Sequence, residues 1–313
     1  MGPCSDAGAF PYQEVTKMRI YHSELTVEVA KRYREVQPDK PLRVLISYGR
    51  RHHQTGGLML NHRTLINGLI MDSGAYTLNS NPVKYSASIT FSGYKAYLKQ
   101  LADKVDFYFN YDAIFDKNGF DTNFGYQVDL ELAGLTPVPV IHDCYGSEVQ
   151  FYIDRGHKLI AIGSGELKFA GRDELYNILA PFHRTGVKVH FLGCTEFEKL
   201  AYLPVYSADS TTWNRTGSSG NIFYWNPLRI GYKKLDKAAL DDGVRRAGAK
   251  FHIRTYPFRR QLEAYLCQEL KLGLDDLYGR EQILNRSLVN LHYFVLIEEY
   301  INHKHKEQGF NTE

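Results

Sequence analysis

Short apolar runs alternate with amphipathic stretches along most of the chain. Each run is continuously apolar and stops at Gly, Asp, His or Ser, which is typical of parallel strands buried on both faces. The pattern predicts strands at Leu42–Tyr48, Leu69–Ser73, Val105–Tyr111, Val138–His142, Leu159–Gly163, Val187–Gly193 and Val205–Ala208, with an eighth at Ile222–Trp225.

The amphipathic stretches between these runs predict helices. They lie at Thr90–Asp103, Tyr126–Gly134, Ser147–Arg155, Arg172–Thr185 and Thr195–Tyr202. One begins with Ser147-Glu-Val-Gln150, the sequence of a capping box, and Gly134, Gly156 and Gly186 stand where helices end. The alternation predicts an α/β protein with a (β/α)8 barrel of the TIM type. A dinucleotide-binding sheet is disfavoured, because no GxGxxG follows the first predicted strand.

The pattern also divides the chain into three parts. Residues 1–17 carry no periodicity, so we expect a flexible N-terminal segment, and residues 18–232 hold the barrel. Residues 233–313 read as helical, with helices expected at Leu235–Ala247, Pro257–Leu272 and Arg280–His303. This C-terminal extension is expected to pack on the barrel or to complete it.

Composition narrows the class of protein. With 43% hydrophobic and 23% charged residues in 313, the chain can form a full core. No run approaches the roughly 20 apolar residues of a membrane span, and the first residues lack a signal-peptide pattern, so we expect a cytoplasmic protein. Cys4, Cys144, Cys194 and Cys267 are scattered, which predicts no metal site and no redox pair. A net charge of +3 is compatible with a nucleic-acid partner.

Polar residues gather where the predicted strands end. Active sites of barrels lie at the carboxyl ends of the strands. Singly, an aspartate there often caps a helix, a histidine is usually structural, and Gly-Ser-Gly is a tight turn. Their joint occurrence favours an active site with paired carboxylates. The residues of this layer are Asp72, Asp112, His142, Gly163, Ser164, Gly165 and Asp209.

Four segments of this layer resemble a known family, the tRNA-guanine transglycosylases (queuine and archaeosine tRNA-ribosyltransferases). In chain order they are Asp72-Ser-Gly-Ala-Tyr76, Ile160-Ala-Ile-Gly-Ser-Gly-Glu166, His190-Phe-Leu-Gly193 and Tyr206-Ser-Ala-Asp209. The continuation Asp209-Ser-Thr-Thr-Trp213 is more similar to the phage and bacterial branch that modifies DNA with 7-deazaguanines. The resemblance covers about residues 41–230.

The resemblance implies exchange of guanine in a nucleic acid for a free 7-deazaguanine base, the co-substrate, with no cofactor. Asp209 would attack C1′ and form a covalent intermediate, and Asp72 would act as general acid and then as base. Asp112 would accept hydrogen bonds from the guanine edge, and Tyr76 would stack on the base. His142 stands where the family has glutamine, and Gly163, Ser164 and Gly165 would offer backbone groups to the base.

Three departures from the family bear on the substrate. The zinc-binding Cys-x-Cys-x-x-Cys is absent, since beyond residue 232 there is only Cys267. The transfer-RNA enzymes carry that module near their nucleic-acid surface, so its loss favours DNA over tRNA. Ala75 replaces a glycine beside the pocket, and His142 in place of glutamine leaves the preferred 7-deazaguanine open.

Contacts with the nucleic acid are expected around the barrel mouth. Arg50, Arg51, His52 and His53 follow the first predicted strand and would neutralise phosphates. Trp213 would stack on an unpaired base, with ordinary packing as the alternative.

Alternatives to base exchange on DNA stay open. They are the same exchange on tRNA, a barrel hydrolase holding a divalent metal with Asp72, Asp209 and His142, and an inert nucleic-acid-binding relative. A homodimer or partner proteins are compatible with each.

Overall fold

The computed structural model describes residues 17–50, 60–116, 118–223, 251–255 and 259–310. The expected flexible segment therefore falls almost wholly outside the described residues. So do Arg51, His52 and His53, and the helix expected at Leu235–Ala247. Within the described part, no helix is long and apolar enough to cross a membrane.

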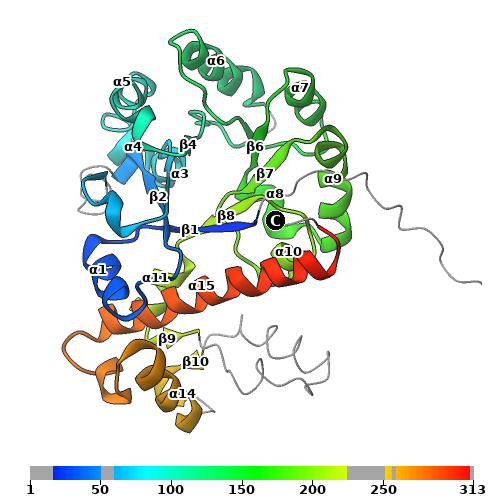
Figure 1. Cartoon of the computed structure of the whole chain (residues 1–313). Helices are drawn as coiled ribbons and strands as arrows, with labels where there is room; N and C mark the ends of the chain where they lie inside the picture. Colours follow the sequence, from blue (N-terminus) through cyan, green and yellow to red (C-terminus); the bar gives the residue numbers. More distant parts are fainter. Residues whose placement is uncertain (1–16, 51–59, 117, 224–250, 256–258, 311–313) are drawn as a thin grey trace, which may run out of the picture.

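Eight parallel strands form a barrel of the TIM type, so the predicted fold class is confirmed (Figure 1). Their order in the sheet is β4-β3-β2-β1-β8-β7-β6-β5, and the parallel bridge Phe109↔Val138 joins the two ends. The strands are β1 (Arg19–Ser23), β2 (Arg43–Ser47), β3 (Gly68–Asp72), β4 (Phe107–Tyr108), β5 (Val140–Ile141), β6 (Leu159–Ile162), β7 (Lys188–Phe191) and β8 (Ser207–Ser210).

Helices connect the strands around the outside. They are α1 (Val27–Val36), α3 (Ala75–Ser80), α4 (Pro82–Tyr85), α5 (Phe91–Leu101), α6 (Phe120–Glu131), α7 (Glu148–Asp154), α8 (Ser164–Phe169), α9 (Arg172–Thr185), α10 (Phe197–Ala201) and α11 (Thr212–Ser218). Gly134, Gly156 and Gly186 have positive φ after α6, α7 and α9, as the sequence predicted. The capping box at Ser147 was wrong, because that residue has helical backbone angles and its side chain caps nothing.

One strand was missed and another misplaced. β1 was missed because its last residues, His22 and Ser23, are polar although they are buried. It pairs with β2 and β8 and so takes the eighth place in the barrel. The predicted strand Ile222–Trp225 is wrong as a barrel strand, because Asn221–Ile222 (β9) instead pairs antiparallel with Phe251–His252 (β10) in a separate sheet.

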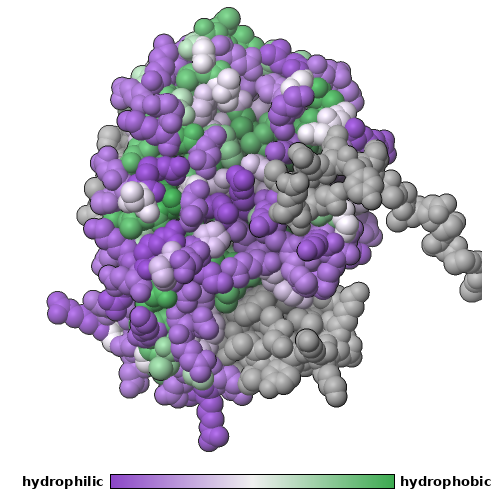
Figure 2. Space-filling view, viewed as in Figure 1, coloured by the Kyte–Doolittle hydropathy of each residue, from purple (hydrophilic) through white to green (hydrophobic). Residues whose placement is uncertain are grey.

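The long C-terminal helix α15 (Gln282–Glu307) lies along the barrel and contacts β1, α1, α10 and α11 (Figure 1). It stands where a barrel places the helix between its last and first strands. Glu298 accepts a hydrogen bond from the Ile20 amide (2.6 Å) and forms an ion pair with Arg43. These two contacts connect α15 to β1 and β2. The face that α15 crosses is mainly hydrophilic in Figure 2.

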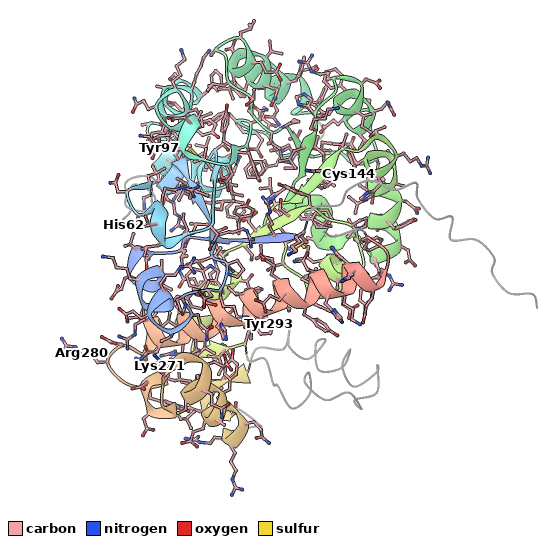
Figure 3. All side chains as sticks on the ribbon, in the orientation of Figure 1. His62, Tyr97, Cys144, Lys271, Arg280 and Tyr293 are labelled. Carbon is pink, nitrogen blue, oxygen red and sulfur yellow. The ribbon has the colours of Figure 1, made fainter. Side chains whose placement is uncertain are left out.

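A smaller apolar cluster lies beyond α15. It is built from β9, α14 (Arg259–Tyr265), a π-helical turn at Leu266–Leu270 and a 3-10 turn at Leu274–Leu277. Lys271 and Arg280, labelled in Figure 3, belong to this part, on the other side of α15 from the barrel strands.

The barrel interior is filled by side chains. Tyr21, Phe107 and Phe109 surround the buried ring of His190, with ring centroids 4.9 to 6.3 Å from it. A filled interior confines any ligand to one end of the barrel.

Candidate active site

The carboxyl ends of the strands open into a cavity of about 590 Å³. It brings together most of the residues that the sequence selected. Lining it are Asp72, Tyr76, Asp112, His142, Gly163, Ser164, Gly165, Asp209 and Arg50. Residues from six strand ends thus meet in one place, which the parallel order of the strands requires.

Each of the three aspartates accepts a hydrogen bond from a serine at a strand end. The pairs are Ser23 with Asp209 (2.7 Å), Ser47 with Asp72 (2.9 Å) and Ser73 with Asp112 (3.0 Å). Sequence reasoning missed the serines as site residues, because a serine that ends a strand looks like a turn residue. These bonds fix how each carboxylate is turned in the pocket.

Asp72 ends β3 and keeps part of its surface open to the cavity. Burial raises the pKa of its carboxyl to about 7, and the nearby charge of Asp112 adds to the rise. Hydrogen bonds from Ser47 and the Gly74 amide act in the opposite direction. Near neutral pH both forms of Asp72 are therefore populated, as a group that gives and takes protons requires.

Asp209 lies inside β8, opposite Tyr21 of β1, rather than after the strand as the sequence suggested. The apolar run ends earlier than the strand because the polar residues of its second half are buried. Oδ1 of Asp209 accepts a hydrogen bond from the Gly193 amide (2.9 Å), and Gly193 has a φ of +64°. A carboxylate held at both oxygens is fixed in the pocket.

Asp112 is buried and pairs with His142, whose Nε2 lies 3.2 Å from Oδ2 of the aspartate. The backbone amide of His142 donates to Glu148 (3.0 Å). The Phe115 ring lies 5.2 Å from the imidazole at a 34° tilt and lines the cavity. Phe115 was missed because it lies in a loop where no periodic pattern marks it.

Gly163 lies against the imidazole of His142. A Cβ at this position would come 2.7 Å from Nδ1 of His142, closer than such contacts allow. Gly163 has ordinary extended angles, so it is the space and not the backbone conformation that requires glycine here. At Gly74, by contrast, both the positive φ of 84° and the Gly49 backbone exclude a side chain.

Gly163→Ala is therefore expected to move the His142 imidazole away from Asp112. If the cavity takes a purine base, as the resemblance implies, this should weaken its binding about tenfold. Calorimetric titration with guanine or a 7-deazaguanine measures this. Gly171→Ala is the matched control, because a Cβ there meets nothing within 4 Å and the residue lies outside the cavity. Equal affinities for the two variants would contradict the role of Gly163.

Two arginines line the cavity at its mouth. Arg50 forms an ion pair with Glu24 (3.1 Å), a residue with a positive φ of 63°. Arg215 of α11, which sequence reasoning missed, is exposed and has no acidic partner among the described residues. A guanidinium that lines a pocket and has no acidic partner in the described part of the chain is suited to a phosphate.

Trp213 does not lie at the mouth, and its predicted stacking on a base was wrong. Only 2% of its surface is exposed, and its indole N–H donates to the carbonyl of Ser23 (2.9 Å). Apolar burial decided its place. The tryptophan instead holds the end of β1, from which Ser23 reaches Asp209.

The zinc site of the resembled family has no counterpart in the described residues. No group of three or more His, Cys, Asp or Glu side chains there is arranged to hold a metal ion. Cys194 is buried, and burial raises the pKa of its thiol. The residues present do not fit that zinc site.

Comparison with known proteins identifies no family for this chain. No family model matches the chain, and no curated protein sequence matches it. Similar solved structures include the YdjI aldolase from Escherichia coli K12 (10% identity, 80% of this chain and 90% of that chain, TM-score 0.43).

Two others are the carboxyl transferase domain of Rhizobium etli pyruvate carboxylase (12% identity, 84% of this chain and 52% of that chain, TM-score 0.44) and KGPDC from Streptococcus mutans (12%, 74% and 98%, TM-score 0.31). None of the three is named as a base-exchange enzyme. At these identities and scores they carry no argument about the activity of this chain.

Proposed function

We propose that the protein is a guanine transglycosylase that replaces guanine in DNA with a 7-deazaguanine base. The observation that carries the proposal is the meeting of Asp72, Asp112 and Asp209 in one cavity, in three different settings. The carboxyl of Asp72 has a pKa near 7, and Asp112 is paired with a histidine. Asp209 accepts hydrogen bonds from a serine hydroxyl and a backbone amide. Base exchange at C1′ needs an acid–base group, a base-recognition group and a nucleophile.

In the first half of the reaction Asp209 attacks C1′ while the bond from C1′ to the guanine nitrogen breaks. The guanine leaves with the bonding electron pair and takes a proton from Asp72. In the second half the incoming base attacks C1′, loses its proton to Asp72 and releases the Asp209 carboxylate. At the end Asp72 has regained its proton and Asp209 is again a free carboxylate, as in glycosidases that act with retention.

Recognition of the base falls to Asp112 and its neighbours. Each of its oxygens already accepts one hydrogen bond and has a further lone pair for the N1–H and 2-amino groups of guanine. Tyr76 is 62% exposed although it lines the cavity, which suits a ring that covers a bound base. The base must leave its stack to reach these groups, so a flipped or unpaired nucleotide is the substrate.

Arg215 supplies a contact to the phosphate backbone. Arg215→Ala is expected to weaken DNA binding roughly 3- to 10-fold and to reduce the slope of log K against log salt by about one. Fluorescence anisotropy at several salt concentrations measures both quantities. Arg280→Ala, on the far side of α15 (Figure 3), is the matched control. An unchanged salt slope for Arg215→Ala would remove this contact from the proposal.

The preference for DNA over tRNA rests on the absence of the zinc-binding module from the sequence. Labelled guanine or 7-deazaguanine should enter single-stranded or duplex DNA when the protein is added, and should enter tRNA more slowly. Faster incorporation into tRNA would keep the chemistry and change the substrate. No incorporation into either polymer would refute the proposed function.

A further inference from the structure

His190 lies directly beneath the proposed nucleophile and has no part in the steps above. Its imidazole is fully buried in the barrel interior. Nε2 lies 3.3 Å from Oδ1 of Asp209, and Nδ1 lies 2.7 Å from Oγ of Ser207. A polar ring in an aromatic interior is costly unless both nitrogens have partners, and both have.

The partners decide which nitrogen carries the proton. An ionised carboxylate only accepts hydrogen bonds, so Nε2 must be the protonated nitrogen and donate to Asp209. In the neutral ring Nδ1 is then the acceptor, and the Ser207 hydroxyl donates to it. The chain of donors runs from Ser207 through His190 to Asp209, because a hydroxyl can turn to suit the ring.

The donors divide unequally between the two oxygens of Asp209. Oδ1 accepts from two groups, the Gly193 amide (2.9 Å) and His190 Nε2 (3.3 Å). Oδ2 accepts from one, the Ser23 hydroxyl (2.7 Å). Since a carboxylate oxygen has two lone pairs in its plane, Oδ1 is saturated and Oδ2 keeps one free.

We infer that His190 is a positioning residue that, with the Gly193 amide, clamps Oδ1 of Asp209 and makes Oδ2 the oxygen that attacks C1′. The inference rests on the proposed function. The new bond joins Oδ2 to C1′, and Oδ1 becomes the carbonyl oxygen of the resulting ester. Both Oδ1 donors stay in place throughout, so the carboxylate that is released in the second half forms in a site already arranged for it.

Two amide substitutions separate positioning from packing. A glutamine places its amide nitrogen as many bonds from Cβ as Nε2 of histidine, whereas an asparagine reaches only as far as Nδ1. His190→Gln should therefore keep the donor to Asp209, and His190→Asn should lose it. We expect covalent adduct formation in a single turnover to stay within about tenfold of wild type for glutamine and to fall about 100-fold for asparagine.

The same variants are measured for thermal midpoint and for affinity toward free guanine, which should change little because Asp112 and Tyr76 are untouched. Ser207→Ala should slow adduct formation less than His190→Asn, since it leaves Nε2 in place. If the asparagine variant does not fold, His190→Leu takes its role.

Equal rates for glutamine and asparagine, whether both slow or both fast, would overturn the clamp. A wild-type protein that forms no adduct with any nucleic acid would instead refute the proposed function, and the clamp with it.

Discussion

Asp209→Asn is expected to abolish the covalent adduct and to lower base exchange by about four orders of magnitude or more. The amide of asparagine is a very poor nucleophile. It can still accept a hydrogen bond from the Gly193 amide, so the fold should survive. Denaturing electrophoresis of the protein with a labelled oligonucleotide detects the adduct, and incorporation of labelled guanine measures the exchange.

The control for this substitution is Asp173→Asn, an exposed aspartate in the first turn of α9 and outside the cavity. It should exchange bases at the wild-type rate. Peptide mapping of the wild-type adduct should place the oligonucleotide on Asp209. An adduct that persists in Asp209→Asn, or that maps to another residue, would show that a different group attacks.

Asp72→Asn is expected to slow adduct formation by about 100- to 10,000-fold, because asparagine cannot protonate the departing guanine. The pH dependence follows from the pKa of about 7. In wild type the rate should be constant below pH 7 and fall about tenfold per pH unit above it, since the proton is lost there. Single-turnover rates measured at evenly spaced values between about pH 5 and pH 9 give the profile.

The same substitution has a second consequence, for stability. The folded protein holds the Asp72 proton up to about pH 7, whereas an unfolded chain releases it near the ordinary value of 3.8. The stability that the neutral form contributes is therefore full below that lower pKa and is lost as pH rises toward 7. The free energy of unfolding of Asp72→Asn minus that of wild type should thus be larger at pH 8 than at pH 4, by about 1 to 3 kcal/mol.

Thermal unfolding at the two pH values tests this independently of any substrate. Asp103→Asn, in an exposed turn after α5, serves as control and should show no such difference. If Asp72→Asn abolished the pH dependence of the reaction but left the pH dependence of stability unchanged, the group whose titration affects stability would be another residue. A wild-type rate that does not fall above pH 7 would remove Asp72 as the acid.

The sequence predicted the barrel because short patterns of neighbouring residues mark its strands and helix ends. Continuous apolar runs mark strands that are covered on both faces, and the glycines after α6, α7 and α9 mark helix ends. The sequence did not predict β1, because its polar residues His22 and Ser23 are buried by contacts with residues far away in the chain. Ser23 is buried against Asp209, which is 186 residues away in the chain.

The candidate site shows the same difference between what the sequence reveals and what depends on the tertiary structure. By itself the sequence determined which aspartates interrupt or follow an apolar run, because such a polar residue is visible in one dimension, although it placed Asp209 after a strand that in fact contains it. Only the tertiary structure decided the surroundings of each aspartate. These are the serine it accepts from, the burial and the Asp112 charge that raise the Asp72 pKa, and the donors around Asp209. It also moved Trp213 from the mouth to the core and brought Arg215 to the mouth. Protonation and orientation depend on distances across strands, and those distances exist only once the barrel has closed.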